Sequence, residues 1–374
     1  WKKRYGNSFF DNFDKNYKLI QNRLGLKKSN KANINKHTKR IIDGAKKLNW
    51  KYIPVPENYT EEKINSDTFG VSENSLINNY INDFKNNGGQ LIPNLSLIRF
   101  VFINNKIEEA ICFDLSKKIY IKIKADNYFL CCGSIQTPYI LKKNKIITNT
   151  ISSQFHCNLR FLPIFRDKIN IKKKTFASHE IDEFQKDGLM IIPSEFKLKY
   201  LSSVISSYSN ENIKNILNSI NYGGLYVAQL RMNSKIKINS MKFFKDPVLT
   251  NYLNEDDKRL INFSINKMIK LLFESGANEI FLPYSKNYKI NKNNFSRNLN
   301  NLNYRDLNMI SVHIMSSIPM FNNKIIDERG KIQKLNNLII SDGSILPENI
   351  GQSPQGTIML FSMEIVERFL DDKK

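Results

Sequence analysis

Histidine is the residue type in this chain best suited to moving a proton near neutral pH. The sequence contains four of them: His37, His156, His179 and His313. An imidazole with an ordinary pKa of about 6.5 can accept the proton of a hydroxyl group. His313 opens the segment HIMSSIPM, and His156 lies within FHCNLRF. Residue type alone leaves a buried structural histidine as the commoner outcome, so the surrounding pattern must decide between the two.

The four cysteines show no pattern typical of metal ligands or of a redox motif. They are Cys112, Cys131, Cys132 and Cys157, and two of them are adjacent at the end of an apolar run. None has the spacing of a zinc site, so we predict no metal. We expect buried free thiols in a reducing compartment, and therefore a cytoplasmic protein.

Two glycine-containing turns follow apolar runs that are typical of buried strands. Gly133 and Ser134 follow the run 128–132, and Asp342 and Gly343 follow the run 338–340. A glycine after a buried strand allows the backbone to approach a ligand closely. An Asp-Gly pair is also common in ordinary turns, so both interpretations stay open from these residues alone.

Hydrophobic periodicity outlines the elements that would position these residues. A helix is predicted over 255–275, with acidic residues in its first turn and Gly276 after its end. A second helix is predicted from Gln355, with apolar residues recurring at helical spacing up to Phe369. Strands are predicted at 97–103, 107–113, 119–123, 128–132, 159–165, 189–192 and 225–238. The mixture indicates an α/β protein with an additional set of alternating strands.

The bulk composition sets limits on the class of protein. The chain has 374 residues, 41% of them hydrophobic, which is enough for a globular protein of one large or two ordinary domains. The net charge is +22, but the lysines are scattered rather than gathered along one helix, so we predict no nucleic-acid partner. No apolar run approaches the roughly 18 residues of a membrane helix, so we predict no integral membrane segment.

Four segments together resemble the glucose–methanol–choline (GMC) family of flavoenzymes. HIMSSIPM at 313–320 is similar to the family's HPMGTCRM stretch, and NLIISDGSILPENIGQSPQGTIMLFS at 337–362 is similar to its C-terminal signature. The strand, turn and helix at 126–141 and the acidic-start helix at 252–283 also match family patterns. Their order and spacing carry the resemblance, which covers about residues 70–374.

The resemblance implies a fold and a division into domains. We expect an FAD-binding Rossmann-like α/β domain formed by 70–150 and 306–374. A second α+β domain, built on an antiparallel sheet and formed by 151–305, would bind the substrate. Residues 1–69 are expected to pack on the FAD domain. The implied activity is FAD-dependent oxidation of a primary or secondary alcohol, with proton abstraction and hydride transfer to the flavin N5 atom.

The resemblance also assigns roles to individual residues. His313 would be the general base, and Ser353 would stand where relatives carry an Asn or His that binds the substrate oxygen. The backbone of Leu97 would meet the adenine, with an ordinary core position as the alternative. The remaining cofactor-binding residues implied by the family pattern are Gly133, Ser134, Asp342, Gly343, Gln355 and Thr357.

The sequence departs from the family pattern in ways that support a second hypothesis. It contains no G-x-G-x-x-G, the fingerprint that cradles the FAD pyrophosphate near the N-terminus of GMC proteins. Ser316 replaces a usual Gly, and Ser353 replaces a frequent Asn. We therefore expect the N-terminal part of the FAD domain to be missing, with a separate N-terminal FAD-binding polypeptide as a partner. The alternative is a degenerate homologue without turnover that acts as a binding or assembly partner. The alcohol and the electron acceptor stay open.

Overall fold

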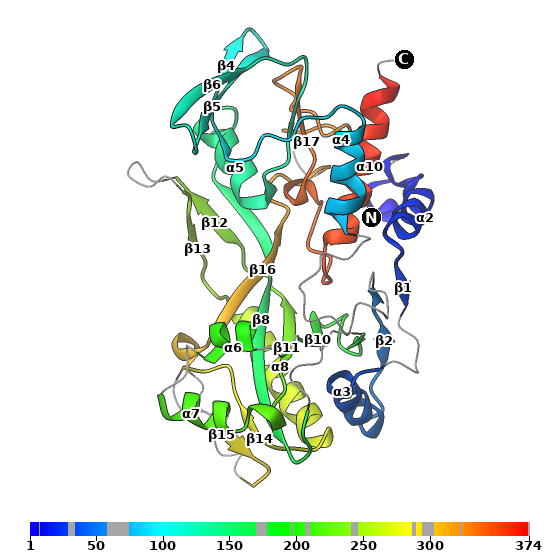
Figure 1. Ribbon diagram of the computed structural model, residues 1–374, viewed down its shortest axis with the longest axis vertical. Coiled ribbons are helices and arrows are strands. Elements are labelled where there is room, and N and C mark those ends of the chain that lie inside the picture. The colour runs from blue at the N-terminus through cyan, green and yellow to red at the C-terminus, as the bar shows by residue number, and fades with distance from the viewer. Residues whose placement is uncertain are drawn as a thin grey trace.

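The computed structural model consists of two bodies of secondary structure joined by a long strand, β8 (Ile151–Phe165). It describes residues 1–6, 8–28, 34–57, 75–169, 178–194, 196, 198–205, 210–240, 246–285, 289–293, 303–321 and 324–372. Figure 1 shows β8 and β16 (Met309–Met315) running side by side from one body into the other. The two strands pair antiparallel, so one ladder of hydrogen bonds extends across the junction.

The lower body in Figure 1 is organised around a ten-stranded sheet. Strand β8 is its centre, because it pairs with β11, β12, β14 and β16 in different parts of its length. Every one of these pairings is antiparallel. The other strands are β2 (Tyr52–Pro54), β9 (His179–Ile181), β10 (Leu189–Pro193), β11 (Tyr226–Arg231), β12 (Ile236–Asn239), β13 (Val248–Thr250), β14 (Ala277–Phe281) and β15 (Lys289–Asn291).

Residues of β8 alternate between two environments, as a strand requires. Phe155, Cys157, Leu159 and Phe161 join a core that includes residues of α3 (Lys36–Lys47) and α8 (Glu255–Glu274). Leu162 instead joins a smaller core with residues of α6 (Leu198–Ile205) and α7 (Asn210–Asn218). His156 follows the same alternation, so it points to the side opposite the α3–α8 core.

The upper body contains a three-stranded sheet and a parallel pair of strands. The sheet is β4 (Leu95–Ile103), β5 (Lys106–Asp114) and β6 (Ile119–Ile123), paired antiparallel in that order. The parallel pair is β7 (Tyr128–Leu130) and β17 (Leu338–Ile340). Helices α5 (Gly133–Lys143) and α10 (Gln355–Asp371) follow, and both contribute to a core around Leu130, Leu338 and Phe361.

The N-terminal segment is divided between the two bodies. Phe9 and Phe10 are buried in the upper core, where both rings contact Phe361 of α10. Helix α2 (Phe13–Leu24) continues along α10. Helix α3 packs instead against α8 of the lower body, with Ile41 fully buried. The packing of residues 1–69 on the FAD domain stays a prediction, and within that range α3 has its apolar face against the lower body.

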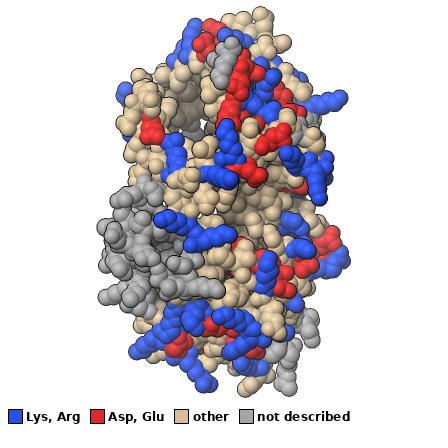
Figure 2. All heavy atoms as spheres, turned by 90° about the vertical axis from the view of Figure 1, so that its right-hand side faces the viewer, with Lys and Arg blue, Asp and Glu red and all other residues tan. Residues whose placement is uncertain are grey.

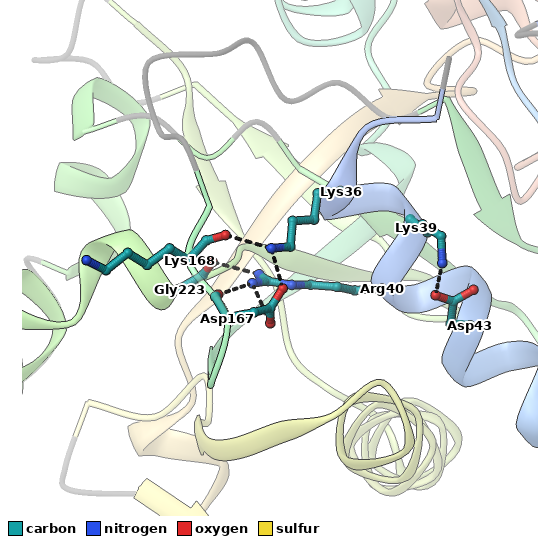
Figure 3. Close-up of polar contacts among 7 residues, drawn as sticks. All are labelled: Lys36, Lys39, Arg40, Asp43, Asp167, Lys168 and Gly223. Atoms are coloured by element: carbon teal, nitrogen blue, oxygen red, sulfur yellow. Dashed lines mark hydrogen bonds and ion pairs between the residues drawn. The ribbon is translucent and has the colours of Figure 1, made fainter. Parts of the chain in front are cut away.

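Arg40 fastens α3 to the lower body through a buried guanidinium group (Figure 3). The group donates to the backbone oxygen of Gly223 at 3.2 Å and to that of Asp167 at 2.7 Å, and it pairs with the Asp167 carboxylate at 3.2 Å. It also lies 3.9 Å above the ring of Phe165. Lys36 extends the contact by pairing with Asp167 at 2.6 Å.

Replacing Arg40 with Met should lower the free energy of unfolding by about 2–3 kcal/mol. The substitution keeps much of the apolar stem but leaves two backbone carbonyl groups without their donor. Lys39→Met is the matched control, because its 2.5 Å pair with Asp43 is exposed and should change stability by no more than about 0.5 kcal/mol. Urea unfolding of both variants checks the prediction, and equal midpoints would contradict it.

Charged side chains are dispersed over the face drawn in Figure 2. Lysine and arginine occur over both bodies with acidic side chains among them. Several of these groups form exposed ion pairs, such as Lys2 with Asp11 and Arg259 with Asp256. The absence of a nucleic-acid partner stays a prediction. Within the described ranges, no helix combines the length and the apolar character needed to cross a bilayer.

Candidate active site

His313 owes its orientation to an irregularity in the pairing of β16 with β8. The register shifts between Val312, which lies opposite His156, and Met315, which lies opposite Gln154. Within the shift, His313 has a φ of 49°, and Ser316, directly after the end of β16, has a φ of 61°. Bulges of this kind redirect side chains, and positive φ in residues other than glycine is uncommon and costly. Such strain concentrates at functional sites, so the backbone itself singles out this segment.

His313 belongs to a chain of three hydrogen-bonded side chains from three different segments. Its Nδ1 atom lies 3.0 Å from Nδ1 of His156 on β8. The Nε2 atom of His156 lies 2.5 Å from Oδ1 of Asn349, which is in the loop between β17 and α10. The Asn349 amide nitrogen donates to the backbone oxygen of Phe155 at 2.9 Å. The structure therefore brings together the two histidines that the sequence placed far apart.

Burial keeps both imidazoles neutral at physiological pH. It lowers the pKa of His156 to about 4, and the neighbouring His313 and Arg231 act in the same direction. Burial also lowers the pKa of His313 below its ordinary value. A neutral imidazole has a lone pair available, so His313 can accept a proton at neutral pH. Among the described residues, none bonds its Nε2 atom, which leaves that atom available for a ligand.

Replacing Ser316 with Gly should raise the free energy of unfolding by about 1 kcal/mol. The position has a positive φ, which favours glycine, and the buried Ser316 hydroxyl has no partner among the described residues. Ser317→Gly is the control, because its hydroxyl is also unpartnered but its φ is ordinary. Thermal unfolding compares the two, and a stabilised Ser317 variant with an unchanged Ser316 variant would contradict the backbone argument.

Asp342 ties the ends of the two parallel strands together. Its Oδ2 atom accepts from the backbone nitrogen of Gly133 at 2.9 Å and from Oγ1 of Thr137 at 2.5 Å. Its Oδ1 atom accepts from the nitrogen and the hydroxyl of Ser344, at 2.8 and 2.5 Å. The residue is buried. Both oxygens are thus engaged by the protein, so a cofactor contact would add to a structural role.

The turns after β7 and β17 meet at the carboxyl ends of these strands, where open α/β sheets usually bind ligands. A Cβ atom on Gly133 would meet nothing within 4 Å, and its φ is +80°. A Cβ on Gly343 would lie 3.1 Å from both Ile358 of α10 and the Ser134 hydroxyl. That buried hydroxyl has no partner among the described residues. An open glycine beside an unpartnered hydroxyl fits a polar cofactor here.

The first turn of α10 presents free backbone groups near this junction. Gln355 is exposed and Thr357 is half-buried, and no side chain caps the helix at Pro354. Uncapped amides at the start of a 17-residue helix favour negative charge. Ser353 precedes this turn and is exposed. The described residues show no hydrogen bond between Ser353 and His313, so the structure does not join these two predicted catalytic residues directly.

Leu97 lines an apolar cavity of about 180 Å³ between the three-stranded sheet and β7. Its backbone pairs with Cys112 in the ladder of β4 and β5. The other residues of the cavity are Phe100, Ala110, Cys112, Ile123, Tyr128, Phe129, Leu130 and Leu338. Leu97 is therefore placed as an ordinary core residue would be, and there is also open space beside its strand.

Sequence reasoning missed Asn349 and assigned no catalytic role to His156. The signal for Asn349 was weak, because it is one of six residues between Pro347 and Pro354, and Ser353 is another. His156 could have been found from alternation, since it is polar and faces away from the apolar side of a buried strand. The prediction that Cys131 and Cys132 are buried was wrong: both are exposed after the end of β7.

The parallel strands of the upper body end in glycine turns, and the histidine pair stands where that body meets the antiparallel sheet, as expected for the family that the sequence resembles. Comparison with family models agrees, since N-terminal and C-terminal models described as GMC oxidoreductase match residues 1–158 and 231–362. The chain therefore belongs to the GMC oxidoreductase family. FAD is the cofactor that this membership indicates.

Known proteins resemble the chain at the level of sequence and of fold. An uncharacterized GMC-type oxidoreductase, y4nJ of Sinorhizobium fredii (strain NBRC 101917 / NGR234), is 22% identical over 265 residues. That match covers 67% of this chain and 51% of the relative, so the chain spans about half the length of the curated protein it matches.

Two solved structures share the fold. The crystal structure of pyridoxine 4-oxidase from Mesorbium loti matches with a TM-score of 0.67 at 10% identity. The match covers 91% of this chain and 71% of the oxidase chain. An FAD-dependent oxidoreductase from Chaetomium thermophilum, solved with a bound fragment, has a TM-score of 0.66 at 11% identity, covering 91% and 72%. The expected α/β fold with a second domain on an antiparallel sheet is thereby confirmed.

The comparisons correct one expectation. We expected the chain to lack the N-terminal part of the family's FAD domain, because it contains no G-x-G-x-x-G. The N-terminal family model nevertheless matches from residue 1 to residue 158. A single glycine motif was therefore the wrong test of that region, since a family model weighs every matched position rather than one turn.

Proposed function

We propose that this protein oxidises a primary or secondary alcohol with FAD as the cofactor and His313 as the general base. The observation that carries the proposal is a neutral, half-buried His313 whose Nε2 atom has no partner among the described residues. When bound, FAD would accept the hydride that leaves the alcohol carbon. His313 Nε2 would take the hydroxyl proton, since a base of this type near neutral pKa suits that transfer.

Other residues would bind and orient the reactants. Ser353 could donate a hydrogen bond to the substrate oxygen, because it is exposed in the loop that also carries Asn349. Gly133, Ser134, Asp342 and Gly343 would hold the cofactor where the strands β7 and β17 end. We propose that the backbone of Leu97 meets the adenine beside the apolar cavity.

The amides of Gln355 and Thr357 would stabilise negative charge at the start of α10. The helix begins with no side-chain cap, so these groups are available to a ligand. The degenerate homologue without turnover is not favoured, because the histidine pair and the junction glycines are assembled in a consistent geometry.

The reaction partners follow from the same proposal. The substrate is a small-molecule alcohol, and the electron acceptor is either oxygen or another oxidant. A reducing compartment such as the cytoplasm suits the four free cysteines, two of which are exposed. A separate N-terminal polypeptide is no longer needed to account for residues that align with the family's N-terminal model.

An anaerobic absorbance experiment tests the proposed function. The purified protein is incubated with FAD, freed of excess, and titrated with a panel of primary and secondary alcohols. Bleaching of the flavin band near the blue end of the spectrum by at least one alcohol is the expected result. A protein that binds FAD but is bleached only by dithionite would overturn the alcohol assignment while keeping the flavoprotein one.

A further inference from the structure

The hydrogen bonds around Asn349 determine which of its side-chain atoms faces His156. The backbone nitrogen of Gly351 donates to Oδ1 at 3.0 Å, while Nδ2 donates to the oxygen of Phe155 at 2.9 Å. An amide nitrogen cannot accept from a backbone N–H, so both contacts fix the amide in one orientation. Oδ1 is therefore the atom that lies 2.5 Å from Nε2 of His156.

This orientation sets the positions of the protons on both histidines. Oδ1 can only accept, so Nε2 of His156 must carry a proton. A neutral imidazole has one N–H, which leaves Nδ1 of His156 as an acceptor. The contact of 3.0 Å between the two Nδ1 atoms then requires that His313 donates from its Nδ1. The second nitrogen of His313, Nε2, is left with a lone pair.

We propose that Asn349 and His156 act as positioning residues that hold His313 in its Nδ1–H tautomer and leave Nε2 as the proton-accepting atom. The proton positions on the two histidines follow from the hydrogen bonds alone, and only their consequence for catalysis rests on the proposed function. The environment maintains the neutral state of His156, because it is buried and faces Arg231 and His313. No carboxylate is bonded to either imidazole among the described residues.

The loop that carries Asn349 is fixed independently of the histidines. The Asn349 backbone nitrogen donates to Oε1 of Gln154 on β8. Gly351 lies against Arg231, with its ideal Cβ position 3.6 Å from the arginine Cδ atom. Asn349 is therefore held against β8 by its own backbone, so the position of its side chain beside His156 does not depend on His313.

Nitrogen-15 NMR of histidine-labelled protein tests the chain directly. With four histidines in the sequence, the ring signals can be assigned from His156→Gln and His313→Gln variants. At pH 8 we expect His313 to show a protonated Nδ1 and a bare Nε2, and His156 to show the reverse. A His313 with a protonated Nε2 would overturn the proposal, whatever its activity.

Asn349→Asp should reverse the direction of the hydrogen bonds between the two histidines, although it loses the hydrogen bond that Nδ2 donates to Phe155. The carboxylate would stabilise the imidazolium of His156 against the influence of Arg231, so that its Nδ1 becomes a donor. His313 would then accept at Nδ1 and carry its proton on Nε2, and flavin reduction at neutral pH should fall by about tenfold or more. An unchanged His313 tautomer in this variant would contradict the proposal.

Two controls separate the outcomes. Asn239→Asp makes the same change of charge at a residue bonded to Thr250, and it should leave all four histidines unaltered. The signals of His37 and His179 report the integrity of the fold in every variant. If NMR confirms the Nδ1–H tautomer and alcohol still reduces the flavin of His313→Ala at the wild-type rate, the hydrogen-bonded arrangement stands and the proposed function is wrong. If His313 carries its proton on Nε2 and flavin reduction in His313→Ala is slow, the proposed function stands and the arrangement of protons is wrong.

Discussion

His313→Ala should retain bound flavin while slowing its reduction by alcohol on the order of a hundredfold or more. Loss of a positioned general base costs about 10²–10⁴ in rate, because the hydroxyl proton must then leave to water. The side chain contacts His156 rather than the junction glycines, so cofactor affinity should change little. Stopped-flow absorbance under anaerobic conditions measures the rate of reduction and the flavin content in one experiment.

The pH dependence gives this prediction a sign. The base acts only when neutral, so the wild-type rate should rise with pH and level off above the pKa of His313. Burial lowers that pKa from its ordinary value, so the plateau should extend to more acidic pH than a free imidazole would allow. The His313→Ala variant should lose this rise.

His179→Ala serves as the control for the loss of a histidine. His179 lies on β9 next to Ser178, away from the chain of three side chains. Its replacement should leave the rate and its pH dependence unchanged. If alcohol reduced the flavin of His313→Ala at the wild-type rate, His313 would have no part in the mechanism.

Asp342→Ala should lower the free energy of unfolding by about 3–5 kcal/mol. The buried carboxylate accepts four hydrogen bonds, and its removal leaves the donors of Gly133, Thr137 and Ser344 unpaired in the interior. Because these donors belong to both strand ends, the junction that would hold the cofactor should loosen as well. Urea unfolding measures the first effect, and FAD titration measures the second.

Asp126→Ala is the matched control, since Asp126 is exposed beyond the same strand pair. It should alter neither quantity. Should Asp342→Ala keep wild-type stability but lose FAD, the carboxylate would act on the cofactor and not on the protein. The stability of Asp342→Asn should lie between those of wild type and Asp342→Ala. The amide keeps one oxygen that accepts two of the four hydrogen bonds, but its nitrogen faces the other two donors.

The sequence predicted the elements whose signal is local. Helix α8 was predicted over 255–275 and is Glu255–Glu274, because its apolar face and its acidic first turn are written into consecutive residues. The helix from Gln355 and the strand at 338–340 were confirmed on the same grounds. His313, Asp342 and Gly343 were singled out by a pattern of neighbours, and their roles stay predictions.

The parts that escaped prediction depend on contacts between distant segments. Asn349 bonds a histidine 193 positions away, and nothing in the loop sequence distinguishes it from Ser353. The positive φ of His313 comes from the pairing register of β16 with β8, which no short window contains. Helix α3 packs against α8, which lies more than 200 residues away along the chain, so no local pattern could identify its partner.

The continuity of β8 through both bodies gives the candidate site a mechanical property. His156 and His313 stand on neighbouring strands of one ladder, so a rocking of the upper body against the lower would carry the imidazoles together and preserve their separation. Asn349 belongs to a loop that leads into α10, and it reaches that ladder through Gln154, Phe155 and His156. Loss of these loop contacts would remove the acceptor of the His156 proton without breaking the ladder of β8 and β16 that sets the spacing of the two histidines.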